Sequence, residues 1–124
     1  MDNNEFRESL ELRTKTFAVD VFRLLDELDG RVSSRVISFQ LGKSASSIGA
    51  NYRESCRAES KADFSHKIQI ALKEAAESCY WLEILAELNS KSESAKILLS
   101  ESIRLRNLFQ SIAKSARRSD KSIH

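Results

Sequence analysis

The sequence predicts an all-α protein, an up-down-up-down antiparallel four-helix bundle that forms one domain over residues 1–124. Three observations support this prediction. The 124 residues contain no proline and three glycines, so the chain lacks the breakers that strands joined by tight turns require. Apolar residues recur with a helical period along four long segments, and the links between them are short and polar. A chain of this length can bury about two thirds of its unfolded surface, which is enough for one core.

The first helix is predicted over residues 4–28, and Asp29 with Gly30 supplies a natural C-terminal stop. The second helix is predicted over residues 34–57, with Ser33 or Ser34 as its N-cap. Both helices place apolar residues at the i, i+3, i+4, i+7 spacing of a helix with one buried face. Their stripes consist of Leu10, Phe17, Val21, Leu24, Leu25 and Leu28, and of Ile37, Leu41, Ser44, Ile48 and Ser55.

The third helix is predicted over residues 61–89, after a turn at Ala58 and Glu59. Ser60 followed by Asp63 resembles a capping box, with Asp in place of the preferred Glu or Gln. The fourth helix is predicted over residues 93–116, and the basic tail 117–124 is expected to fray. The two stripes consist of Phe64, Ile68, Ala71, Ala75, Leu82 and Leu85, and of Leu98, Leu105, Leu108, Phe109, Ile112 and Ala116.

The compartment predicted for the chain is the cytoplasm. No apolar run approaches the roughly 20 residues of a membrane span, so we expect no membrane partner. The polar and acidic start MDNNEFRESLELR is unlike a secretory signal. Cys56 and Cys79 fall on the order of 20 Å apart along the predicted hairpin, which is too far for a disulfide. We therefore expect two buried, reduced thiols.

The second predicted helix is unusually rich in small residues. Gly42, Ser46 and Gly49 lie on one of its faces, beside the apolar stripe. Small side chains permit close approach of another helix, so these three residues are candidates for close packing or for oligomer contacts.

A polar network between the second and third helices is also predicted. Facing positions across the turn place Gln40 level with Glu77 and Ser44 level with Glu74. Half-buried carboxylates need hydrogen-bond donors or a cation, and such a network fixes helix register or a subunit contact. The candidates for this buried polar network are Gln40, Ser44, Asn51, Glu74 and Glu77.

The sequence indicates no enzyme, no metal and no cofactor. The carboxylates Glu74 and Glu77 have no accompanying nucleophile or partner base. A di-iron bundle needs Glu-x-x-His on two helices, whereas Asp63-x-x-His66 occurs once, beside a helix start. The cysteines lack zinc-ligand spacing, and a Gly-rich phosphate loop is absent.

Several words in the central hairpin resemble the 23S rRNA intervening-sequence proteins, a family of small four-helix bundles. They are SSIGANYRES, SKADFSHKIQIALKEA and ESCYWLEIL, and the resemblance is densest over residues 40–85. At Lys43 relatives commonly have arginine, so the charge is kept without the bidentate geometry of a guanidinium. The matching positions are Gln40-Leu41, Ser47-Ile48-Gly49-Ala50-Asn51, Glu54, Ser60, Asp63-Phe64, Lys67, Ile70-Ala71, Lys73-Glu74, Glu77 and Tyr80-Trp81-Leu82.

This resemblance implies a ring-forming bundle, with a homopentamer as the expected assembly, and it implies no defined activity. A related branch contains the accessory proteins of diversity-generating retroelements. Those proteins are pentameric basic bundles that bind a reverse transcriptase and its RNA. The resemblance thus extends the possible partners from the chain itself to RNA or a reverse transcriptase.

Charge is distributed unevenly along this nearly neutral chain. Residues 1–30 carry four Lys/Arg against eight Asp/Glu, and residues 68–99 carry three against five. Residues 31–67 carry seven against three, and residues 100–124 carry six against two. We expect two basic patches at opposite ends of the bundle, as candidate nucleic-acid-binding sites. One consists of Arg53, Arg57, Lys61 and Lys67, and the other of Lys114, Arg117, Arg118 and Lys121.

The function predicted from these features is a non-catalytic, homo-oligomeric binding or scaffold protein. Its basic surfaces, multiplied in a ring, would meet RNA or a nucleic-acid enzyme such as a reverse transcriptase. The alternative is a structural protein–protein adaptor without nucleic-acid binding, in which acidic and basic faces of neighbouring subunits meet.

Overall fold

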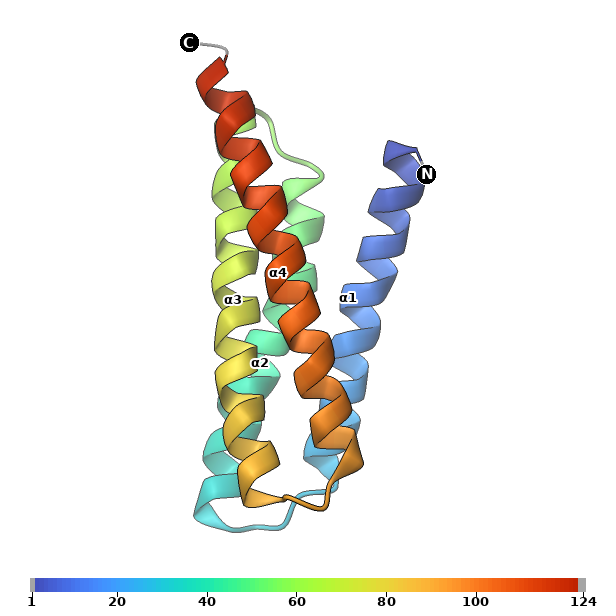
Figure 1. The fold of residues 1–124 in the computed structure, drawn as a ribbon, viewed down its shortest axis with the longest axis vertical. Helices are drawn as coiled ribbons and strands as arrows, with labels where there is room; N and C mark the ends of the chain where they lie inside the picture. Colours follow the sequence, from blue (N-terminus) through green and yellow to red (C-terminus); the bar gives the residue numbers. More distant parts are fainter. Residues whose placement is uncertain (1, 123–124) are drawn as a thin grey trace.

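The computed structural model describes the backbone of residues 2–122 and the side chains of residues 2–119. It contains the helices α1 (Asn3–Asp26), α2 (Val32–Ser55), α3 (Lys61–Leu88) and α4 (Glu93–Ser122), which alternate in direction (Figure 1). No strand occurs in this part of the chain. The predicted all-α four-helix bundle is therefore confirmed.

The start of α1 and the loop after it are fixed by aspartates. Asp2 caps α1, because its carboxylate accepts a hydrogen bond from the backbone N–H of Glu5 at 2.7 Å. At the other end, Asp29 Oδ1 accepts hydrogen bonds from the backbone N–H of Arg31 and from the hydroxyl of Ser34. These side-chain bonds offer the backbone an alternative to further helix. The predicted stop at Gly30 was wrong, since α1 ends at Asp26 and Gly30 has no positive φ.

The N-cap of α2 also differs from the prediction. Arg31 occupies this position and makes no side-chain capping bond, while Ser33 and Ser34 lie inside the helix. Ser34 is used by the Asp29 turn instead. The N-cap of α3 is the predicted Ser60, whose hydroxyl accepts from the backbone N–H of Asp63 at 3.0 Å.

The last helix is longer than predicted. α4 continues past residue 116 to Ser122, so the tail expected to fray is helical over residues 117–122. This stretch has no glycine or proline to stop the helix, and its cations favour the negative end of the helix dipole.

Most residues of the predicted apolar stripes are buried in the core, whereas Phe64 and Ile112 are half-buried and Tyr52 joins the core from outside the stripes. Phe17, Leu41, Ile48, Ile68 and Phe109 are almost completely buried. Tyr52 packs edge-on against Phe109, with ring centroids 5.7 Å apart. Cys79 is buried and Cys56 is half-buried, and both are free thiols.

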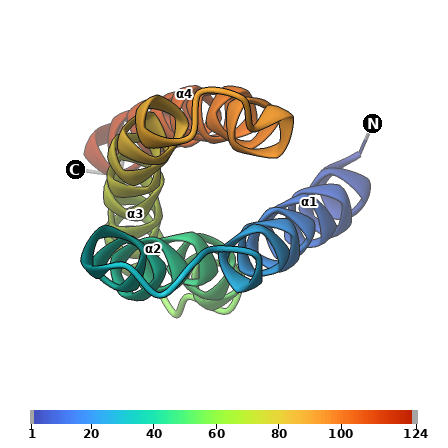
Figure 2. The same cartoon turned by 90° about the horizontal axis from the view of Figure 1, so that it is seen from below.

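The four helices form an open row instead of an evenly packed square. α2 packs closely on α3, and α3 on α4, whereas α1 packs on α2 and only lightly on α4. Viewed along the bundle, α1 and α4 diverge toward the end that carries the N-terminus (Figures 1 and 2). This divergence leaves one side of the core less covered.

Candidate nucleic-acid interface

The two predicted basic patches lie at the same end of the molecule. Figure 1 shows the loop between α2 and α3 beside the C-terminal end of α4, together with the N-terminus of α1. The prediction of one patch per end was therefore wrong. The chain between the two patches runs the length of the bundle along α3 and returns along α4. The C-terminal end of α4 therefore lies at the same end of the bundle as the start of α3.

The residues at this end carry unpaired positive charge. We call Arg53, Arg57, Lys61, Lys67, Lys114, Arg117 and Arg118 the basic end. All are exposed except Lys67, which is half-buried. Among the residues with described side chains, none of them forms an ion pair, whereas Arg13, Arg23, Arg31 and Lys96 elsewhere each do. The side chain of Lys121 lies outside the described residues.

Acidic residues reach the same end from α1. Glu5 and Glu8 are exposed in its first turns, on the helix that diverges from α4. Further exposed carboxylates, Glu54 and Glu59, lie among the cations at the end of α2 and in the loop after it, so this end carries charges of both signs.

The small residues of α2 serve contacts within the chain. A Cβ atom on Gly49 would lie 2.8 Å from Thr14 Oγ1 and 3.2 Å from Thr14 Cβ, so α1 approaches α2 closely at this point. A Cβ on Gly42 would lie 3.1 Å from Cε1 of the Phe22 ring. Ser46 is exposed, and its hydroxyl donates to the carbonyl of Gly42 at 2.8 Å. Gly42 and Gly49 thus explain the packing of α1 on α2.

The five candidates for a polar network are not joined into one. The hydroxyls of Ser44 and Ser78 lie 2.9 Å apart in a buried hydrogen bond between α2 and α3. Asn51 donates to the carbonyl of Ser47 within its own helix. Gln40 is half-buried and makes no hydrogen bond to Glu74 or Glu77.

The carboxylates of Glu74 and Glu77 are half-buried on α3. Burial raises the pKa of Glu74, and the nearby charge of Glu77 raises it further, against the opposing effect of Lys73 and Lys43. Glu77 accepts a long hydrogen bond of 3.5 Å from the indole N–H of Trp81. These contacts order one face of α3 without assembling a reactive pair.

An ion pair that the sequence did not reveal joins α1 to α4. Arg13 Nε and Nη2 donate to Glu101 Oε2 and Oε1 at 2.8 and 2.9 Å, and Arg104 Nε contacts the same carboxylate at 3.2 Å. The hydrogen bond from Arg13 holds the pKa of Glu101 below its usual value, more than burial raises it. Because these residues are 88 positions apart, no local pattern pairs them.

We expect Glu101→Gln to lower the free energy of unfolding at pH 7 by about 1 kcal/mol, since the pair is only partly buried. A depressed folded-state pKa stabilises the fold above the carboxyl's unfolded pKa, and this stabilisation is lost as pH falls through the lower folded pKa. The difference between wild type and variant should therefore shrink below about pH 4.5 in urea titrations. Asp20→Asn, which removes a 3.8 Å pair within one helix, is the control and should cost less. A difference that stays constant with pH would contradict this assignment.

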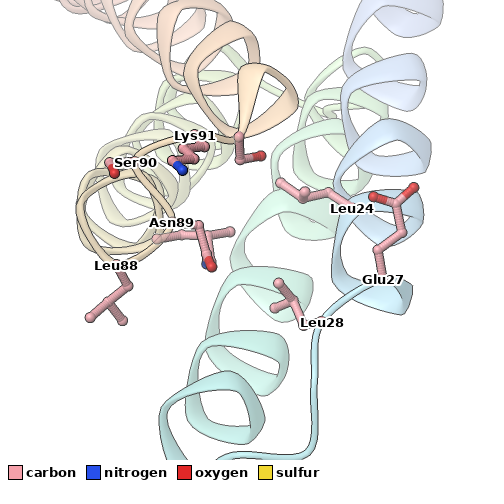
Figure 3. Close-up of a pocket in the computed structure, with 9 residues that line it drawn as sticks. Leu24, Glu27, Leu28, Leu88, Asn89, Ser90 and Lys91 are labelled. Carbon is pink, nitrogen blue, oxygen red and sulfur yellow. The ribbon is translucent and has the colours of Figure 1, made fainter.

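Two larger cavities lie at opposite ends. One, of about 470 Å³, lies between the end of α1 and the turn joining α3 to α4 (Figure 3). Its side chains do not converge, since Leu24 extends toward the opening and Leu88 points away from it. The other, of about 700 Å³, lies at the basic end and includes Arg7 and Phe6 of α1, which sequence reasoning did not single out.

Within the described residues, no three His, Cys, Asp or Glu side chains are grouped so that they could hold a metal ion. No helix in the same part of the chain has both the length and the apolar character needed to cross a bilayer.

The similarity to known proteins extends over most of the helical part of the chain. The family model described as 23S rRNA-intervening sequence protein matches residues 10–111. A similar solved structure, from Bacteroides thetaiotaomicron VPI-5482, is described as a protein with unknown function from the S23 ribosomal protein family. It is 36% identical, the alignment covers 84% of this chain and 97% of that one, and the TM-score is 0.72. No curated protein has significant similarity to this sequence. The C-terminal cations Lys114, Arg117 and Arg118 lie beyond the matched residues.

Proposed function

Because the chain belongs to the 23S rRNA-intervening sequence protein family, whose solved relative has no known function, we propose a non-catalytic, homo-oligomeric RNA-binding scaffold. In this proposal the basic end contacts RNA, alone or held by a nucleic-acid enzyme such as a reverse transcriptase. The observation that carries the proposal is the convergence of unpaired cations from α2, α3 and α4 at one end of the bundle.

Unpaired surface cations suit a polyanion. Their neutralisation by phosphates releases counterions, which supplies affinity without sequence readout. Apart from the half-buried Lys67, the cations are long, exposed side chains near three helix ends, so they can follow an irregular phosphate backbone. A ring would place one such end beside the next and multiply the positive field.

An exposed apolar face supports self-assembly. Val19 and Phe22 of α1 and Val32, Val36 and Phe39 of α2 are 38–68% exposed. The Phe22 ring lies over Gly42, one helical turn from Phe39, so the two stripes meet. We call these five residues the α1–α2 apolar face. Exposed apolar patches of this kind mark protein–protein contacts, and we propose that neighbouring subunits of a homopentamer cover it.

We expect RNA binding to depend steeply on salt. Changing Arg53, Arg57, Lys114, Arg117 and Arg118 to alanine should weaken binding of a short single-stranded RNA on the order of 100-fold at low salt. The slope of log affinity against log salt should fall as well, because fewer counterions are released. Fluorescence anisotropy between about 50 and 200 mM salt measures both quantities.

The matched control removes five cations from the opposite end, Arg23, Arg31, Arg35, Lys91 and Lys96. It should leave both the affinity and the salt slope close to the wild-type values. RNA affinity that is undetectable at low salt, or that is equal in the two variants, would reject nucleic-acid binding. The acidic start of α1 at the same end would then favour the adaptor, in which Glu5 and Glu8 meet cations of the next subunit.

A further inference from the structure

Helices α1 and α4 diverge at the basic end of the bundle (Figures 1 and 2). A groove at this end is lined by residues of both helices. Its volume is about 700 Å³, and all four helices contribute to it. The residues that define its chemistry are Phe6, Arg7, Tyr52, Lys61, Phe64 and Ile112.

The groove has an apolar floor. Tyr52 is buried with its ring against Phe109, and Phe64 and Ile112 are half-buried against the core. Phe6 is 39% exposed on the wall formed by α1. Burial raises the pKa of Tyr52, and the neighbouring Cys56 raises it further, so the phenol keeps its proton and its ability to donate a hydrogen bond.

The charged residues that line the groove are both cations. Lys61 is exposed at the start of α3, and it forms no ion pair with any side chain of residues 2–119. Arg7 has a long contact of 3.9 Å with Glu11 of its own helix, and 45% of its side chain is exposed. Among residues 2–119, whose side chains the structure describes, none that carries a carboxylate lines the groove. An apolar floor between two cations is complementary to an amphipathic ligand with negative charge.

We propose that this groove binds an acidic amphipathic α-helix of a partner protein. Such a helix would lie as an additional rod between the diverging α1 and α4, with apolar residues at i, i+3, i+4 and i+7 packed on Phe6, Phe64 and Ile112. Its carboxylates would face Arg7 and Lys61. A small ligand fits the site less well, because it would leave much of its surface in water, whereas pocket ligands bury most of theirs.

This inference does not rest on RNA binding, although the groove shares Lys61 with the basic end. Phosphates gain from Arg53, Arg57 and the α4 cations on the outer surface, but they gain nothing from the apolar floor. A partner helix gains its affinity mainly from that floor, and the two cations set its charge preference.

The test uses the full chain and two synthetic peptides. One carries leucine at i, i+3, i+4 and i+7 with glutamate at the remaining positions, and the other has lysine in place of glutamate. We expect the acidic peptide to bind once per chain in calorimetry, and the basic one at least about tenfold more weakly.

The groove variant combines Phe6→Ser with Lys61→Glu, two positions outside the core. This variant should bind the acidic peptide at least about tenfold more weakly than the wild type does. The control combines Leu88→Ser with Lys91→Glu at the opposite cavity, where the same changes should leave binding unaltered. Circular dichroism verifies that both variants keep their helices.

Three results with the peptides would overturn the proposal. The acidic peptide could fail to bind, it could bind the groove variant as well as wild type, or the basic peptide could bind equally well. A lower oligomer mass for the groove variant would assign the groove to a second copy of this chain, and the partner-helix proposal would fall.

Discussion

Replacing Gly49 with leucine is expected to lower the free energy of unfolding by on the order of 3 kcal/mol, or to prevent folding. A Cβ atom at this position already meets Thr14 Oγ1 at 2.8 Å and Thr14 Cβ at 3.2 Å. Thr14 cannot yield easily, because it is completely buried and its hydroxyl donates toward the carbonyls of Leu10 and Glu11. The three further heavy atoms of leucine would force α1 away from α2. Urea denaturation at one fixed protein concentration measures the effect.

Gly42→Ala is the matched control on the same helix. Alanine in place of glycine favours a helix interior by about 1 kcal/mol at both positions, so the difference between them reports the neighbour. At Gly42 the nearest neighbour is the far end of the Phe22 side chain, which is 45% exposed, and we expect a neutral or stabilising change. The Gly49→Ala variant should therefore be less stable than the Gly42→Ala variant. Equal stabilities would show that Thr14 does not restrict this position.

The Thr14→Ala change provides a further check in a double-mutant cycle. Removing Oγ1 relieves the shorter of the two contacts, so Gly49→Ala should cost less in the Thr14→Ala background than in wild type. An additive result would place the strain elsewhere.

Phe39→Glu is expected to disassemble the oligomer while the bundle stays folded. Phe39 is 68% exposed and lies outside the buried core, within the α1–α2 apolar face. Loss of a buried aromatic anchor at a subunit contact costs about 2 kcal/mol or more, which is about 30-fold in affinity per interface. A carboxylate at this position adds the free-energy cost of removing its charge from water when the subunits associate. Light scattering should show the wild type near five times the 14.1 kDa chain mass and the variant near the mass of one chain.

Ile97→Glu is the control, since Ile97 is 63% exposed on α4, outside the apolar face. It should keep the wild-type mass. A wild-type mass near 14.1 kDa would reject the pentamer. Equal oligomer masses for the wild type and the Phe39 variant would show that the subunits contact each other through another face. Melting temperatures recorded together with the masses separate disassembly from unfolding.

Local patterns determined much of this protein. The period of apolar residues predicted the four helices and which of their faces are buried, because burial of an amphipathic stripe is the main source of helix stability in a folded chain. The Ser60 cap was likewise readable, since a cap depends on residues three positions apart. The predicted end of α1 was wrong because the hydrogen bonds of the Asp29 turn compete with the helix before Gly30 is reached. The predicted end of α4 was wrong because a basic sequence does not by itself end a helix.

The location of the basic end illustrates a different error. The common end of the two patches follows from the up-down topology, because residues 61–122 form two antiparallel passes. The order of the four helices was thus enough to place both basic patches at one end of the bundle, where they form a single surface.

The amino-acid sequence by itself thus determined four amphipathic rods, their core faces and a set of surface cations. Only the tertiary structure decided that Gly49 meets Thr14, that Arg13 binds Glu101 and that α1 and α4 diverge around an apolar groove. The physical reason is range. Helix periodicity and capping act within a few residues, whereas these contacts depend on how two rods far apart in sequence cross and separate, which no local pattern encodes.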